Sequence, residues 1–287
     1  MARAPEQLQK IVEESKDLPT LSTVVTKVGE MVRDPRVSAA EVGRAISEDQ
    51  ALTAKVLKLV NSSFYGFPQR VNNITRAIVI LGFNRVRNLA LTASVLSALP
   101  KRHGPFSVAS FWAHSVATAI ASDSIARIMR FASEEEDAFV SGLLHDIGKL
   151  ASIHLFRPEF EEVMEAVVEK NYLMVEAEQG VMGVTHANVG GWLSQRWNFP
   201  ESIAASIRMH HQPELARQNR RLVMIVHVGD IVARSLGLGS GGDMRIPVVD
   251  ATAWRELGLT HEALDQCMKE TLDRTEQTKE FLEMVTK

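Results

Sequence analysis

The sequence has a single cysteine, Cys267, among its 287 residues. One thiol cannot form an internal disulfide or build a cysteine-based zinc site. The residues from Met1 to Gln7 lack the apolar core of a signal peptide. The longest apolar-leaning run, Leu89 to Leu99, is interrupted by polar side chains and is far too short to cross a membrane. We therefore expect a cytoplasmic protein without membrane association.

A charge excess of either sign is also missing. The chain holds 32 Lys and Arg against 35 Asp and Glu, which gives a formal net charge of −3. This balance does not favour nucleic acid or an anionic membrane surface as a partner, and we expect neither. The 45% hydrophobic content is sufficient for a sizeable core, which excludes a disordered or fibrous chain.

Strand signals are scarce, because no alternating run is bounded by Asn-Gly or Asp-Gly. Helical periodicity is strong instead: the apolar residues from Leu21 to Val32 recur at spacings that place them on one helix face. Capping-box patterns predict helix starts at Ser38, Ser47 and Ser133, and Pro200 with Glu201 is typical of a first helical turn. The sequence predicts an all-α fold built as a two-part helical bundle.

Two turn-rich stretches divide the chain. Residues 100–105 separate two helical blocks, and the glycine-rich residues 237–242 are typical of a flexible loop. We expect an N-terminal helical subdomain over residues 1–100, a second over 106–236, and a flexible loop with a C-terminal helix over 237–287. That last helix, from Glu262 to Val285, either packs back on the body or mediates formation of a homodimer; the sequence leaves both open.

Histidine and aspartate side chains interrupt apolar helical segments of the second block. They are His114, the adjacent pair His145 and Asp146, His186, the adjacent pair His210 and His211, and Asp230. Unpaired polar groups are costly to bury, and a metal site removes that cost because imidazoles and carboxylates ligate first-row divalent ions. Taken singly, each is more simply explained as a hydrogen-bonded core residue. The order and the intervals of all seven favour a metal site.

This pattern resembles a known family. His114, His145-Asp146 and Asp230 resemble the HD superfamily of metal-dependent phosphohydrolases, and His186 with His210-His211 is similar to the two-metal arrangement of its HD-GYP branch. The chain from Leu18 to about Leu236 resembles the HDOD domain, an HD-related output domain of bacterial signalling proteins. Three further segments carry this resemblance: residues 18–21 (LPTL), 57–66 (LKLVNSSFYG) and 74–82 (ITRAIVILG).

The resemblance implies a metal centre of two divalent ions, iron or manganese. It places His114, His145, Asp146 and Asp230 around one ion and His186, His210 and His211 around the other, with Asp146 bridging the two. In the three-metal variant a carboxylate lies one turn before the first histidine. This chain has Ser110 there, so we expect two ions at most.

Lys149 follows Asp146 by one helical turn and matches a lysine that contacts a phosphate in such enzymes. The alternative is a surface lysine that extends into solvent at the end of a helix. If the protein is an enzyme, Asp146 and Lys149 are the candidate catalytic residues. Four arginines near the paired histidines are explained either as phosphate contacts or as solvent-exposed side chains; they are Arg208, Arg217, Arg220 and Arg221.

Two functions of different classes follow. The first is a stand-alone regulatory output protein of bacterial signal transduction, which holds a dinuclear metal centre and binds a protein or nucleotide partner. The second is a metal-dependent phosphohydrolase or phosphodiesterase acting on a nucleotide or another phosphoester, in which two ions activate a bridging water. Residues 212–221 contain neither Gly nor Tyr, whereas the HD-GYP branch has a Gly-Tyr-Pro loop there. This departure argues against cyclic di-GMP as the substrate.

Overall fold

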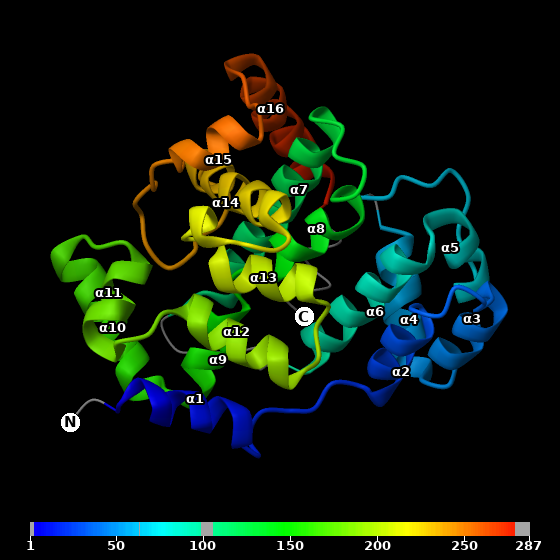
Figure 1. Ribbon diagram of the computed structural model, residues 1–287, viewed down its shortest axis with the longest axis horizontal. Helices are drawn as coiled ribbons and strands as arrows, with labels where there is room; N and C mark the ends of the chain where they lie inside the picture. The colour runs from blue at the N-terminus through cyan, green and yellow to red at the C-terminus, as the bar shows by residue number, and fades with distance from the viewer. Residues whose placement is uncertain (1–2, 63, 99–105, 279–287) are drawn as a thin grey trace. The chain divides into compact units, whose positions relative to one another are not determined.

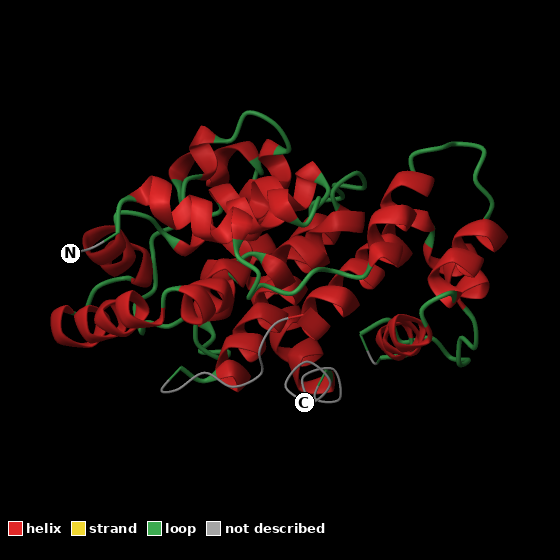
Figure 2. Ribbon diagram, turned by 90° about the horizontal axis from the view of Figure 1, so that it is seen from below, coloured by secondary structure: helices red, strands yellow, loops and turns green. Residues whose placement is uncertain are grey.

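The computed structural model describes residues 3–62, 64–98 and 106–278, and these ranges contain helices, turns and loops but no strand. The all-α prediction is confirmed (Figures 1 and 2). No described helix is long and apolar enough to cross a membrane. The predicted break at residues 100–105 and residues 279–285 of the predicted last helix lie outside the described ranges.

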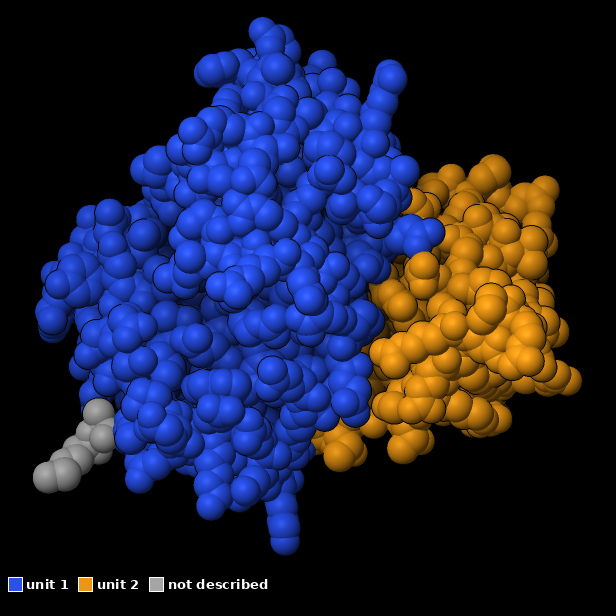
Figure 3. All heavy atoms as spheres, in the orientation of Figure 1, with its two compact units in different colours: residues 1–18, 100–275, 286 blue, residues 19–99, 276–285, 287 orange. Residues whose placement is uncertain are grey.

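The chain divides into two compact units, coloured separately in Figure 3. Unit 1 contains residues 1–18, 100–275 and 286, and unit 2 contains residues 19–99, 276–285 and 287. The first helix, α1 (Pro5–Glu14), therefore belongs to unit 1 rather than to the block that follows it in sequence. The subdomain boundaries expected from the sequence remain a prediction.

Unit 2 is a bundle of short helices. They are α2 (Thr23–Met31), α3 (Ala39–Ser47), α4 (Gln50–Val60), α5 (Ile74–Leu81) and α6 (Phe83–Ala98). The capping box at Ser38 is confirmed, because the Ser38 hydroxyl accepts the Glu41 N–H and the Glu41 carboxylate accepts the Ser38 N–H. The start predicted at Ser47 is wrong. Ser47 ends α3, and the Asp49 carboxylate caps α4 by accepting the Leu52 N–H.

Unit 1 contains the remaining helices. They are α1, α7 (Val108–Ile128), α8 (Glu135–Leu144), α9 (Ile147–Leu155), α10 (Arg157–Lys170), α11 (Met174–Met182), α12 (His186–Arg196), α13 (Glu201–Met209), α14 (Arg220–Ser235), α15 (Ala251–Glu256) and α16 (His261–Gln277), with a 3₁₀ turn at Pro213–Leu215. The start predicted at Ser133 is wrong, because α8 begins two residues later without a side-chain cap. The start at Glu201 after Pro200 is confirmed.

Helix α7 lies at the centre of unit 1 and is buried along most of its length. Small buried side chains such as Ala117, Ala121 and Ser122 let α8 and α14 pack closely against it. Each of these three helices carries part of the predicted metal site at or near its buried face. Close helix packing is therefore what brings residues from distant parts of the sequence together.

The crossing of α9 and α12 depends on Gly148. A Cβ atom at this position would lie 1.9 Å from the carbonyl oxygen of His186 and 2.6 Å from the backbone nitrogen of Gly190. No side chain fits at such distances, so only glycine lets the two helices approach this closely. The contact holds the start of α9, where Asp146 lies, against the start of α12, where His186 lies.

We predict that Gly148→Ala destabilises the protein, because the added methyl group forces α9 away from α12. Overpacking of this kind costs about 1–3 kcal/mol in the free energy of unfolding. The matched control is Gly180→Ala in α11, where an added Cβ meets nothing within 4 Å. There the better helix propensity of alanine should stabilise the protein by about 0.5–1 kcal/mol. Urea unfolding measures both, and equal effects of the two substitutions would contradict the packing argument.

Candidate metal centre

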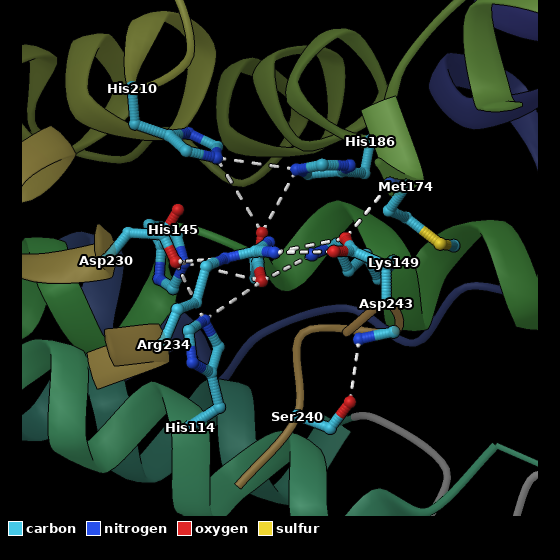
Figure 4. A network of polar contacts seen from close by, with 12 residues as sticks. His114, His145, Lys149, Met174, His186, His210, Asp230, Arg234, Ser240 and Asp243 are labelled. Carbon is cyan, nitrogen blue, oxygen red and sulfur yellow. Dashed lines mark hydrogen bonds and ion pairs between the residues drawn. The ribbon is translucent and has the colours of Figure 1, made fainter. Parts of the chain in front are cut away.

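All seven histidines and aspartates singled out in the sequence lie together in the interior of unit 1 (Figure 4 shows five of them by label). Five helices or their ends supply them: His114 comes from α7, His145 and Asp146 from the junction of α8 and α9, His186 from the start of α12, His210 and His211 from the end of α13, and Asp230 from α14. The structure thus brings the whole predicted set into one cluster. The role of its members as metal ligands stays a prediction.

The cluster consists of two groups, and the ligand atoms within each group lie within 4.8 Å of one another. We call them the His186 position, formed by Asp146, His186, His210 and His211, and the His114 position, formed by His114, His145 and Asp230. The histidines and Asp230 divide as the resemblance implies, but Asp146, which the resemblance places around the first ion with His114, groups here with His186. The two positions are adjacent, because His145 and Asp146 are neighbours in the chain.

Asp146 faces both positions with a different carboxylate oxygen. Its Oδ1 lies 3.0 Å from Nε2 of His186 and 3.7 Å from Nε2 of His210. Its Oδ2 lies 3.3 Å from Nε2 of His145 and 3.7 Å from Nε2 of His114. A carboxylate that bridges two ions needs this arrangement, with one oxygen directed to each position.

The imidazole tautomers follow from their backbone contacts. Nδ1 of His145 lies 2.7 Å from the carbonyl oxygen of Gly142, and Nδ1 of His210 lies 2.9 Å from that of Ile207. A carbonyl oxygen only accepts hydrogen bonds, so in both rings Nδ1 carries the proton. In the neutral ring Nε2 then has a free lone pair, which is the form that ligates a metal.

Several of the inward-facing atoms have no hydrogen-bond partner outside the cluster. Nε2 of His114, Nε2 of His145 and Oδ1 of Asp146 are buried, and their near neighbours are other inward-facing atoms of the cluster: Nε2 of His114 lies 3.0 Å from Oδ1 of Asp230, and only Nε2 of His145 has no contact shorter than 3.3 Å with a carboxylate. In addition, Nε2 of His186 lies 2.9 Å from Nε2 of His211 and 3.4 Å from Nε2 of His210. Converging nitrogen and oxygen lone pairs repel one another unless a cation lies among them. The donor set of imidazole nitrogens and carboxylate oxygens fits a first-row divalent ion.

The protonation states of the histidines also suit a metal. Burial lowers the pKa of His210 to about 4 and lowers the pKa of His114 and His211 below the ordinary value, so these rings are neutral near pH 7. His186 differs: burial lowers its pKa, but the Glu178 carboxylate beside it outweighs burial, and the pKa is raised. His186 is therefore the most readily protonated of these four rings.

The two aspartates are ionised despite their burial. Burial alone would raise the pKa of Asp146, but the neighbouring His145 and Lys149 outweigh it and hold that pKa well below its usual range. The pKa of Asp230 is likewise held well below its usual range, because Arg234 outweighs burial. Both carboxylates are thus in the anionic form that ligates cations.

Lys149 is not a surface residue. Its side chain is 0% exposed, and its Nζ donates to Oδ2 of Asp146 at 2.6 Å (Figure 4). The interpretation as a solvent-exposed lysine is therefore wrong, and the phosphate-contacting role stays a prediction. In the described structure this ammonium group neutralises the aspartate that lies between the two positions.

The nearby arginines lie at the protein surface. Arg208 pairs with Glu201, Arg220 with Glu256 and Arg221 with Glu134, while Arg217 is exposed. These contacts support the interpretation of the four arginines as ordinary surface side chains. None of these three ion pairs involves a residue of the cluster.

Three functional neighbours escaped the sequence analysis. Glu178 in α11 contacts His186, Arg234 in α14 donates to Oδ1 of Asp230 at 2.9 Å, and Asp243 pairs with Arg234 at 3.0 Å. The spacing of Asp230 and Arg234 by four residues on one helix could have indicated their pairing. Nothing in the sequence connects Glu178 or Asp243 to the cluster, because they come from elements that only the fold brings close.

The glycine-rich stretch expected to be a flexible loop is packed beside the cluster. We call residues 237–243 the glycine strap. The N–H of Ser240 donates to the carbonyl of Ser110 at 3.0 Å, and a Cβ at Gly239 would lie 2.3 Å from the backbone nitrogen of His114. At its far end Asp243 accepts the Met174 N–H at 2.9 Å (Figure 4). These contacts hold the strap against α7 and α11.

The strap and the surrounding helices bury most of the centre. The residues His114, His145, Asp146, Lys149, His186 and His210 are each at most 1% exposed, and Asp230 is 3% exposed. A Cβ at Gly241 would lie 3.4 Å from Nζ of Lys149, so the strap covers this lysine directly. His211 alone among the seven is partly exposed.

Comparisons with known proteins agree on one family. A sequence model of the HDOD domain matches residues 18–213. An uncharacterised protein of Treponema pallidum is 25% identical over 227 residues, which is 79% of this chain but 44% of that protein. This chain thus spans less than half the length of the curated relative it matches.

Two solved structures are similar to this chain over most of its length. An HDOD domain protein of unknown function from Geobacter sulfurreducens has a TM-score of 0.71 at 26% identity, with 98% of this chain and 97% of that chain covered. A candidate phosphohydrolase from Shewanella amazonensis has a TM-score of 0.67 at 23% identity, with 92% and 97% covered. At 23% identity, the similarity to the second structure shows a shared fold only.

We predict that the protein, purified without chelator, carries about two transition-metal ions per chain by elemental analysis. Stripping the metal should lower the melting temperature, because an ion at 100 times its Kd contributes about 2.7 kcal/mol to stability. His211→Gln should reduce the metal content, since it removes a ligand of the His186 position. His261→Gln, at an exposed residue of α16, is the control and should leave the content unchanged. Absence of metal from a correctly folded wild-type protein would refute the site.

Proposed function

The chain belongs to the HDOD domain family, and we propose that it is a regulatory output protein of bacterial signal transduction that holds a dinuclear metal centre. In this proposal the protein acts by binding a protein or nucleotide partner. The centre serves to order unit 1 so that the partner surface has a defined shape. Turnover of a substrate is not part of this function.

The proposed centre is held by the seven clustered residues. Asp146 would bridge, His186, His210 and His211 would complete one position, and His114, His145 and Asp230 the other. When bound, two divalent ions supply concentrated positive charge that satisfies converging lone pairs. The chain's own contribution is to fix the donors: backbone carbonyls hold the rings of His145 and His210, and buried cations keep Asp146 and Asp230 ionised.

One observation carries the preference for an output role: the centre is closed. A hydrolytic site needs an open coordination position and a cleft that admits the substrate. Here six of the central residues are at most 1% exposed, and the glycine strap lies directly over Lys149. The strap covers Lys149 and the backbone of His114, and of the seven clustered residues only His211 is partly exposed, so the packed strap leaves little of the cluster accessible to a phosphoester. Such burial suits a centre that cross-links helices.

The alternative function is a metal-dependent phosphohydrolase, and the bridging geometry of Asp146 favours it. One carboxylate oxygen faces each position, so Asp146 could hold two ions close together, as two-metal hydrolysis needs. The likeness to a candidate phosphohydrolase points the same way. This function needs two rearrangements: the strap must leave α7, and Lys149 must exchange Asp146 for a phosphate oxygen.

We predict that the manganese- or iron-loaded protein releases no product from p-nitrophenyl phosphate, bis(p-nitrophenyl) phosphate or a panel of nucleotides above the rate of the His211→Gln variant. A closed centre excludes these substrates, whatever their leaving group. Colorimetric and chromatographic assays measure release. If the wild type releases product and the His211→Gln variant does not, the protein is a hydrolase and the output role is wrong.

Two variants of the glycine strap test whether packing of the strap is the reason that the protein releases no product. Gly239→Ala and Gly237→Ala both place alanine at a positive φ, +72° and +65°, but the new methyl group collides with α7 only at position 239. The backbone strain is thus matched, and the two variants differ in whether the strap is displaced. If activity develops in Gly239→Ala alone, the protein is a hydrolase held shut by its strap; inactivity of both supports the output role.

A further inference from the structure

We propose that the two metal positions have unequal affinities and that Glu178 is the positioning residue that makes the His186 position the tighter one. The inference rests on the proposed dinuclear centre and assigns an order to its filling. The first ion enters the His186 position, and the second enters the His114 position with weaker binding. Glu178 lies outside the pattern of histidines and aspartates and outside the family resemblance stated for them.

Glu178 holds His186 by two contacts. Its Oε2 lies 2.6 Å from Nδ1 of His186 and accepts the backbone N–H of the same residue at 2.9 Å. Both side chains are almost completely buried, at 1% exposure or less. The carboxylate therefore fixes the ring with Nδ1 protonated and Nε2 directed toward Oδ1 of Asp146, 3.0 Å away.

The other oriented histidines lack such a partner. The rings of His145 and His210 donate to backbone carbonyl oxygens, which are neutral acceptors. A carboxylate acceptor draws the ring proton more strongly and makes the opposite nitrogen a better donor to a metal. An outer carboxylate of this kind typically changes metal affinity by about 10–100-fold. Among these three rings only His186 has this advantage, and it is a ligand candidate of the His186 position.

Buried cations weaken the His114 position instead. Nε of Arg234 lies 2.9 Å from Oδ1 of Asp230, and Nζ of Lys149 lies 2.6 Å from Oδ2 of Asp146. These are the carboxylate oxygens that face the His114 position. An ion there would be repelled by both charges at close range in a medium of low dielectric constant. Asp243 pairs with Arg234 at 3.0 Å and offsets that charge, so the uncompensated contrast is between the Glu178 carboxylate at the His186 position and the Lys149 ammonium at the oxygen that faces the His114 position.

A purely structural role for Glu178 is the competing explanation. By accepting the His186 N–H, Glu178 also caps the start of α12, where a negative charge is favourable. Glu178→Gln separates the two roles. The amide oxygen can still accept both hydrogen bonds at the same length, so the cap persists, but the charge that strengthens His186 as a donor is lost.

The experiment titrates chelator-stripped protein with Mn²⁺ by isothermal titration calorimetry. The wild type should bind two ions in two separable steps. Glu178→Gln should weaken the tighter step by about 10–100-fold and leave the weaker step unchanged. Glu178→Asp, which keeps the charge on a shorter side chain, should recover part of the lost affinity. Glu169→Gln is the charge-matched control at an exposed residue of α10 and should change neither step.

A second measurement excludes a folding defect. The melting temperature of metal-free Glu178→Gln should match that of the metal-free wild type, and ¹⁵N chemical shifts should show His186 still protonated at Nδ1. If Glu178→Gln lowers the melting temperature of the metal-free protein as much as that of the metal-loaded protein, Glu178 acts as a helix cap and the inference is wrong.

The outcomes of the titration separate the inference from the proposed function. A wild type that binds no ion overturns the dinuclear centre itself. Two ions bound with equal affinity, or a tight step unchanged by Glu178→Gln, leave the centre standing and overturn the assignment of Glu178. Loss of the weaker step alone also overturns it, because the effect would then lie at the His114 position.

Discussion

The carboxylate of Asp146 is the constraint on which the interior of unit 1 depends. It is 1% exposed, it lies between two groups of imidazole and carboxylate donors, and each of its oxygens faces one of them. Removing an anion from water in this way is costly unless opposite charge surrounds it. Lys149 provides one such charge within the chain, at 2.6 Å. Oδ1 lies 3.0 Å from Nε2 of His186, and in the proposed centre a metal ion would supply the remaining positive charge.

Close packing of helices makes this concentration of charge possible. Gly148 lets α9 touch α12, and the small residues of α7 let α8 and α14 approach it. Donors from five helices or helix ends then converge at distances of 3–4 Å between atoms. Charges that converge so closely would open the bundle if each were not compensated. Arg234 with Asp243 and Lys149 with Asp146 provide that compensation on one side, and Glu178 with His186 on the other.

The sequence predicted the helical class and the clustered residues because both leave local traces. Periodicity identifies helices, and the adjacent pairs His145-Asp146 and His210-His211 mark the site before any fold is known. The sequence did not predict Glu178 or the packing of Gly239, since their partners are distant in the chain and depend on how α11 and α7 are placed. The predicted helix start at Ser47 was wrong because a second capping residue lies two positions later. The carboxylate of Asp49, rather than the hydroxyl of Ser47, caps α4.

The closed centre also explains why ligand composition alone does not determine function in this chain. Two metal positions and a lysine beside a bridging aspartate are the parts of a phosphohydrolase, yet chemistry requires access as well as ligands. Here access is governed by the glycine strap, whose close approach to α7 no larger residue at 239 would allow. The same seven residues therefore support a structural centre while the strap is packed and a reactive one if it is displaced. In the proposed function, the position of the strap rather than the ligand set separates an output role from hydrolysis.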